Sequence, residues 1–269
     1  MLYLCDTVTK LSIQNRGAVI VCGSHGGVYS GRLAAAAGVR AAIFSDAGIG
    51  LDGAGIGSLA YGTALGMALA AVAHDSARIG DASDMFGRGR VSRVNPIARS
   101  LGCIEGMPCE AAARALMAAP RPADLAPYLT ESRHVFAAPD RRPRLILIDS
   151  ASLIREEDGG QIVVTASHGG LIGNNPQSAL RVDAYAACFH DAGVGADEAG
   201  ISRLPVLNRR GIAAMTVSAD SARIGDALSV FETGRISHLN EKARYLGLRQ
   251  GQRLREAVMQ IGGHLPQLR

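Results

Sequence analysis

The sequence predicts an α/β protein built by tandem duplication of one α/β unit, with parallel or mixed sheets, helices, and halves related by a pseudo-twofold axis. First, the chain aligns with itself. Second, each copy alternates short apolar stretches with helix-forming ones, which is typical of α/β folds. Third, 48% of the 269 residues are apolar and only 19% are charged, which suits two hydrophobic cores and excludes a disordered chain.

The internal repeat covers most of the chain. A Ser-His-Gly-Gly motif at residues 24–27 recurs at 167–170, at an offset of 143. Farther along the offset is 145, and residues 46–102 match residues 191–247 at 29 of 57 positions. Agreement at this level indicates two copies of one structural unit.

The repeat also predicts the domain boundaries. The first repeat spans residues 1–118 and the second spans residues 144–269. Between them, residues 119–143 are rich in Pro and Arg and read as a linker.

Each copy has the same predicted order of elements. Apolar runs predict strands at 2–5, 18–22, 40–44 and 67–72, and in the second copy at 145–148, 162–165, 184–189 and 212–217. Helices are expected at 30–37 and, in the two copies, from Ile56 and from Ile201. The tail of each copy predicts a last helix, with Ser92 or Ser237 as N-cap and a glycine as the stop.

Composition excludes several classes of protein. The net charge is +4, but no basic run interleaves with aromatic residues, which make up only 4% of the chain, so no nucleic-acid partner is expected. The most apolar windows are shorter than a membrane span, and the start of the chain does not read as a signal peptide, so no membrane partner is expected. Five cysteines without a C-x-x-C pair indicate reduced thiols and a cytoplasmic protein. The oligomeric state stays open, a homo-oligomer included.

The Ser-His-Gly-Gly motif is the first candidate for chemistry, because it is expected as a loop at the carboxyl end of a strand, where α/β sheets bind ligands. Each imidazole would act as a general base or a metal ligand, and the glycine amides would hold an anion or an oxyanion. The serine hydroxyl of each motif is a further catalytic candidate, although adjacent side chains usually point apart and need not form a pair with the histidine. The alternative is a tight turn. The candidate catalytic residues are His25, His168, Ser24 and Ser167, and the candidate anion-binding glycines are Gly26, Gly27, Gly169 and Gly170.

A second candidate is the Gly-rich loop that follows the third strand of each copy. Asp46 and Asp191 stand at its start and are predicted to be catalytic carboxylates. The first copy contains a G-x-G-x-x-G match, but the acidic residues in the loop oppose a dinucleotide pyrophosphate. For Asp52 and Asp197 the favoured alternative is helix capping.

The run Asp-Ser-Ala-Arg-Ile-Gly-Asp, unchanged at 75–81 and 220–226, is the third candidate. Arg78 and Arg223 present a planar fork that suits a substrate acid group, and Ser76 and Ser221 are further donors. Equally, each arginine could pair with a neighbouring aspartate. Asp81 and Asp226 are expected to cap helices.

Differences between the copies favour the second half as the active one. It carries His190, Glu198, Ser218 and His238 where the first copy has Ser45, Gly53, Ala73 and Arg93.

These residues together predict a small-molecule enzyme with an anionic substrate. The expected reaction is hydrolysis of a C–N or amide bond, or a lyase reaction, on a small carboxylate in a cleft between the repeats. Alternatives are a non-catalytic ligand-binding or sensor protein and, less favoured, a dinucleotide-dependent enzyme. A divalent metal is compatible with the histidines and aspartates, although no metal motif supports it.

Overall fold

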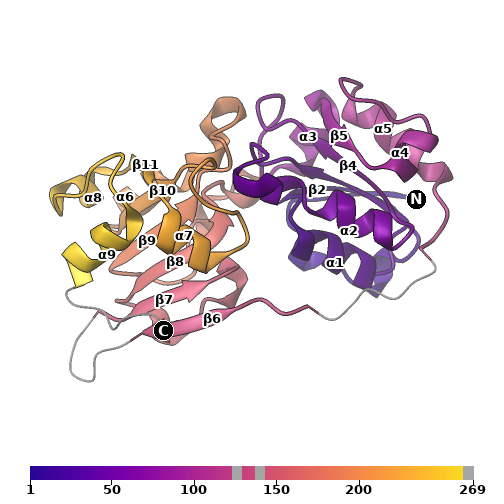
Figure 1. Ribbon diagram of the computed structural model, residues 1–269. Coiled ribbons are helices and arrows are strands. Elements are labelled where there is room, and N and C mark those ends of the chain that lie inside the picture. The colour runs from indigo at the N-terminus through magenta and orange to yellow at the C-terminus, as the bar shows by residue number, and fades with distance from the viewer. Residues whose placement is uncertain (123–128, 137–142, 263–269) are drawn as a thin grey trace. The chain divides into compact units, whose positions relative to one another are not determined.

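The structure, a computed structural model, describes residues 1–122, 129–136 and 143–262 (Figure 1). The chain forms two compact units. Unit 1 comprises Met1–Thr130 together with the short segments Ile172–Asn174 and Ala192–Ala199. Unit 2 comprises Glu131–Leu171, Asn175–Asp191 and Gly200–Arg269.

Unit 1 contains a five-stranded sheet in the order β1-β2-β3-β4-β5. Its strands are β1 (Leu2–Cys5), β2 (Val19–His25), β3 (Ala41–Ser45), β4 (Ala68–Val72) and β5 (Val91–Val94). The first four strands are parallel, and β5 pairs antiparallel with β4. Short 3-10 segments are η1 (Val8–Lys10), η2 (Ile13–Asn15), η3 (Leu51–Ile56) and η4 (Leu116–Ala118).

Helices cover both faces of this sheet, so unit 1 has three layers (Figure 1). The helices are α1 (Val28–Ala36), α2 (Ser58–Ala64), α3 (Ala82–Arg88), α4 (Pro96–Ser100) and α5 (Cys109–Ala115). Alternate strand residues face opposite sides. Ile20 and Phe44 therefore belong to one core with residues of α1, whereas Val21 and Ile43 belong to the other with residues of α3 and α5.

Unit 2 contains a six-stranded sheet in the order β11-β10-β9-β8-β7-β6. Its strands are β6 (Arg133–Phe136), β7 (Leu145–Ile148), β8 (Ile162–His168), β9 (Ala186–His190), β10 (Ala213–Val217) and β11 (Ile236–Leu239). Strands β7 to β10 are parallel, and β6 and β11 are antiparallel to their neighbours. The helices are α6 (Arg203–Arg209), α7 (Ala227–Thr233), α8 (Glu241–Tyr245) and α9 (Leu254–Gly262).

The predicted fold class is confirmed: the protein is α/β, with two mixed sheets and helices. The eight predicted strands are present, and β1 to β5 follow the same order as β7 to β11. That this common order arose by duplication remains an interpretation.

The second copy has no α-helix after its Ser-His-Gly-Gly motif. In the place of α1 it has 3-10 turns, η7 (Ile172–Asn174) and η8 (Pro176–Ser178). Three further 3-10 segments of this copy are η5 (Ala151–Leu153), η6 (Glu156–Asp158) and η9 (Ala196–Ile201).

The predicted linker also contains structure. Strand β6 lies within residues 119–143 and pairs with β7. Residues 123–128 and 137–142 of that stretch lie outside the described residues. The domain boundaries stay a prediction.

The predicted caps at Ser92 and Ser237 were wrong. Both serines lie inside short strands, β5 and β11, and the following asparagines cap the helices. Asn95 Oδ1 accepts hydrogen bonds from the N–H groups of Ala98 and Leu69, at 2.9 and 3.1 Å. Its Nδ2 donates to the carbonyl of Met67 at 2.8 Å. One buried amide thus joins β4 to α4, which a serine hydroxyl could not do.

No helix among the described residues is long and apolar enough to cross a membrane.

We expect Asn95→Ala and Asn240→Ala to destabilise the protein by similar amounts, because Asn240 makes the corresponding bonds to α8 and β10. Losing the cap and leaving buried backbone groups unsatisfied should cost about 2–4 kcal/mol in each case. Urea unfolding measures the loss. Ser100→Ala, which removes one exposed hydroxyl–carbonyl bond, is the control and should change stability by less than about 0.5 kcal/mol.

Candidate active site

Polar side chains gather at one edge of the unit 1 sheet. Asp6, His25, Asp46 and His74 lie at or just beyond the carboxyl ends of β1, β2, β3 and β4. These four strands are parallel and adjacent, so the four side chains come from one edge. Asp6 has a structural role there, since its Oδ1 accepts the N–H of Ala82 at the start of α3.

The Ser-His pair of each motif lies in a strand, not in a loop as predicted. Between Val21 and His25, β2 contains two more residues than the facing stretch of β3, and β8 has the same irregularity before His168. A bulge of this kind changes where the following side chain points. Only the two glycines of each motif form the turn.

The imidazoles of both motifs are held by local hydrogen bonds. Nδ1 of His25 accepts the N–H of Gly27 at 3.1 Å, and Nδ1 of His168 accepts that of Gly170 at 3.2 Å. A ring nitrogen that accepts an N–H carries no proton. In the neutral ring the proton is therefore on Nε2, so each imidazole presents a donor.

The motif serines and first glycines bond to the backbone. Ser24 Oγ accepts the N–H of Val8 at 3.0 Å, and Ser167 Oγ accepts that of Ala151 at 2.9 Å. The Gly26 amide donates to the carbonyl of Ser45 at 2.8 Å.

Gly169 makes the same bond to the carbonyl of His190, also at 2.8 Å. All four motif glycine amides thus have acceptors within the protein, and this arrangement does not support the expected amide nest.

Asp46 and His74 form the acid–base pair of this edge. Asp46 is 2% exposed, and its Oδ1 lies 3.0 Å from Nδ1 of His74, whose side chain is 30% exposed. The same oxygen accepts the backbone N–H groups of His74 and Gly48, at 2.9 and 3.0 Å. Burial raises the pKa of Asp46, but hydrogen bonds and the charge of His74 outweigh it and lower the pKa below its usual value. Asp46 is therefore ionised at neutral pH.

Sequence reasoning missed His74. It stands directly before the repeated run, at the position where the second copy has Ala219. A comparison of the copies at this position would have found it. Asp191 keeps the corresponding backbone bond, since its Oδ1 accepts the N–H of Ala219 at 2.9 Å.

At the position of His74 the second half therefore has an alanine in place of the imidazole. His190, which favoured that half, is fully buried, and its Nε2 lies 3.0 Å from the carbonyl of Ala222. Burial lowers the pKa of His190 despite this bond and the charge of Asp191, so the ring is neutral.

The Gly-rich loops have strained backbones. Ala47 and Ile49 have φ values of 49° and 63°, and Ala192 and Val194 have φ values of 51° and 63°. Non-glycine residues in this region cost roughly 1–3 kcal/mol each, and such strain clusters at functional sites.

One of these loops, Ala192–Ala199, belongs to unit 1 and lies against His74. A Cβ on Gly193 would be 2.8 Å from Cδ2 and 3.0 Å from Nε2 of the His74 ring, so only glycine allows this approach. The Ala196 amide donates to the carbonyl of His74 at 2.8 Å.

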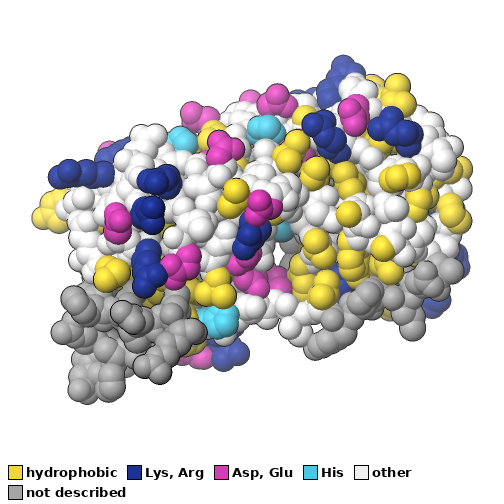
Figure 2. Space-filling model, viewed as in Figure 1, with side chains coloured by type: hydrophobic (Ala, Val, Ile, Leu, Met, Phe, Trp, Pro, Cys, Tyr) yellow, Lys and Arg dark blue, Asp and Glu magenta, His cyan; other side chains and the backbone are white. Residues whose placement is uncertain are grey.

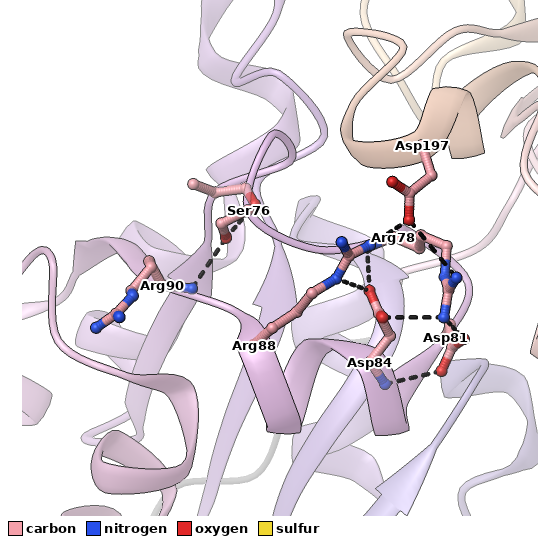
Figure 3. A network of polar contacts seen from close by, with 8 residues as sticks. Ser76, Arg78, Asp81, Asp84, Arg88, Arg90 and Asp197 are labelled. Carbon is pink, nitrogen blue, oxygen red and sulfur yellow. Dashed lines mark hydrogen bonds and ion pairs between the residues drawn. The ribbon is translucent and has the colours of Figure 1, made fainter.

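Arg78 is surrounded by carboxylates (Figure 3). Its Nη2 lies 2.9 Å from Asp84 and 3.2 Å from Asp81, and its Nη1 lies 3.6 Å from Asp197. Arg88 contacts Asp84 and Asp197 as well. Arg78 was expected either to bind a substrate acid group or to pair with a neighbouring aspartate, and in the structure it forms ion pairs with aspartates.

Arg223 likewise contacts the aspartate three residues on, Asp226, at 3.1 Å. Ser76 and Ser221 hold backbone: Ser76 Oγ donates to the carbonyl of Ala73 and accepts the N–H of Arg90, at 2.8 and 2.9 Å. Ser221 makes the equivalent bonds to Ser218 and Arg235.

The aspartates of these loops divide into two groups. Asp81 and Asp226 cap α3 and α7, as predicted. Asp52 and Asp197 do not cap α2 and α6, which begin after Gly57 and Ser202. Both have positive φ values inside 3-10 segments, which places them before the helices.

Asp46→Asn should lower stability in a pH-dependent way. Because the folded-state pKa of Asp46 is below its usual value of about 3.9, the ionised form stabilises the folded protein. That contribution is complete above pH 4 and is lost as pH falls through the lower folded-state pKa. Thermal unfolding at pH 3 to 7 should show a deficit of about 1–3 kcal/mol at neutral pH that shrinks toward pH 3. Asp220→Asn, at an exposed position, should show no such trend.

Comparisons with models of protein families, with curated proteins and with solved structures found no match. Among the described residues, no three His, Cys, Asp or Glu side chains are grouped so that they could hold a metal ion. The geometry of the Asp46–His74 pair therefore carries the functional assignment.

Proposed function

We propose that the protein is an enzyme that moves protons on a small molecule at the carboxyl edge of the unit 1 sheet. His74 is the general base and Asp46 orients it. The observation that carries the proposal is the 3.0 Å contact between His74 Nδ1 and the buried, ionised carboxylate of Asp46.

This contact determines how His74 reacts. Asp46 accepts a hydrogen bond from Nδ1–H, so Nε2 of the neutral ring has the lone pair and accepts a proton from substrate or water. The resulting imidazolium is stabilised by the adjacent carboxylate, as in other Asp–His pairs.

His25 supplies the opposite function. Its Nδ1 accepts the Gly27 amide, so Nε2–H is a donor that polarises a carbonyl or protonates a leaving group. A base on the end of β4 and a donor on the end of β2 suit a reaction that removes one proton and delivers another.

Hydrolysis of a C–N or amide bond and elimination by a lyase both fit this pair. Because Ser24 already accepts a backbone N–H, we favour water, activated by His74, as the nucleophile of a hydrolytic reaction.

A small carboxylate remains the proposed substrate. Its acid group would compete with Asp197, whose side chain is 54% exposed, for Arg78 and Arg88. Both arginines present guanidinium forks suited to a carboxylate.

Binding without turnover is the second candidate, and unit 2 favours it. There Ala219 replaces the base, while the carboxylate of Asp191 and the imidazole of His168 remain.

The proposal is tested by finding turnover and then removing the base. A thermal-shift screen of small acids, amides and phosphates, with and without a chelator, selects compounds for a turnover assay. With a compound that is turned over, we expect His74→Gln to lower kcat by roughly 10²–10⁴-fold. Asp46→Asn should have a smaller effect and should add little in the double variant.

Two controls locate the active site. His134→Gln changes a histidine on β6 and should leave kcat unchanged. Asp191→Asn removes the equivalent carboxylate of unit 2. If it abolishes turnover while Asp46→Asn does not, the assignment to unit 1 is wrong, and if no compound in the screen is turned over, binding without catalysis takes its place.

A further inference from the structure

A pocket on unit 2 is lined, among the described residues, by basic side chains and by no carboxylate. It lies beside β11 and α8 and has a volume of about 530 Å³. Arg244, Arg249 and His238 line it together with Gln250, and Leu248 and Leu239 are among its apolar lining. Volumes of ~300–1,000 Å³ are usual for small-molecule sites.

Unit 1 has the same local backbone but different charges. The loop after α4 pairs with β5 through the N–H of Val91 and the carbonyl of Met107, at 2.9 Å. The loop after α8 pairs with β11 in the same way, through Ile236 and Gln252 at 2.9 Å. Positions 145 residues apart can therefore be compared directly.

In unit 1 the residue equivalent to Gln250 is a carboxylate, Glu105. Glu105 lies between two guanidinium groups, 4.0 Å from Arg93 Nη1 and 3.6 Å from Arg99 Nη2. The equivalents of the two arginines in unit 2 are His238 and Arg244, and the equivalent of Glu105 is Gln250. Unit 2 therefore has a basic residue at both arginine positions but a neutral amide at the position of the carboxylate.

Unit 2 also gains a cation at this place. Arg249 replaces Ile104. Within the described part of the chain, no carboxylate lies within ion-pair distance of the guanidinium of Arg244 or of Arg249. Nδ1 of His238 is buried there without a hydrogen-bond partner.

The two arginines of this pocket are accessible, and so is Gln250. Arg244, Arg249 and Gln250 are exposed, and basic side chains protrude around α8 on the face drawn in Figure 2. A ligand can therefore reach these three side chains.

We propose that this pocket binds the phosphate group of a small phosphorylated molecule. The two arginines Arg244 and Arg249 provide two positive charges, and a phosphate monoester carries about two negative charges at neutral pH. Arginine forks also match phosphate oxygens well. The apolar lining from Leu239 and Leu248 suits a non-polar part of the same ligand.

The test is calorimetric titration of the phosphate-free full-length protein with inorganic phosphate and with glycerol phosphate. Both should bind, and acetate should bind at least tenfold more weakly. Gln250→Glu, which restores the residue found in unit 1, should weaken phosphate binding at least tenfold. Arg249→Ile, which likewise introduces the residue of unit 1, should weaken it severalfold.

Gln14→Glu adds the same charge at an exposed position of unit 1 and should leave phosphate binding unchanged. Circular dichroism and thermal unfolding verify that each variant is folded. Absence of phosphate binding by the wild-type protein would overturn the proposal, and so would equal losses in Gln14→Glu and Gln250→Glu. Acetate binding as tight as phosphate binding would show a carboxylate site in its place.

Discussion

The edge of unit 1 depends on the buried carboxylate of Asp46, which must find hydrogen-bond donors. The amide of Gly48 meets this need only because the loop after β3 turns back on itself, with Gly48 at a φ of 77°. The amide and ring of His74 reach the same oxygen from the end of β4. One buried charge thus determines the paths of two loops, and those paths place an imidazole beside an ionised carboxylate.

The fold could be predicted because parallel strands covered on both faces are continuous apolar runs. β3 and β7, for example, are buried along their whole lengths. The short edge strand Val91–Val94 has no such run, since Ser92 and Arg93 interrupt it, and its serine was interpreted as a cap. Strand β6 was missed for a related reason, because its place in the sheet depends on pairing with β7 and not on its own composition.

The site was less predictable than the fold. A residue that occurs in both copies can be there because it holds the backbone, and not because it takes part in chemistry. Ser24 and Ser76 recur, and both hold neighbouring backbone in the structure. The acid–base pair depends on His74, which does not recur. Whether a carboxylate and an imidazole meet depends on loop paths after two strands, and no local pattern of residues determines those.

Functional differences between the two units are therefore best sought at equivalent positions where the hydrogen bond to the backbone is the same but the charge of the side chain differs. The N–H of Arg78 donates to the Asp84 carboxylate, and the N–H of Arg223 donates to the Ser229 hydroxyl. The turn is retained while a negative charge is lost. Replacement of Glu105 by Gln250 follows the same rule, since it leaves basic groups without their anion. Hydrogen bonds to the backbone thus keep the same turns in both units, while the charges of the side chains around those turns differ.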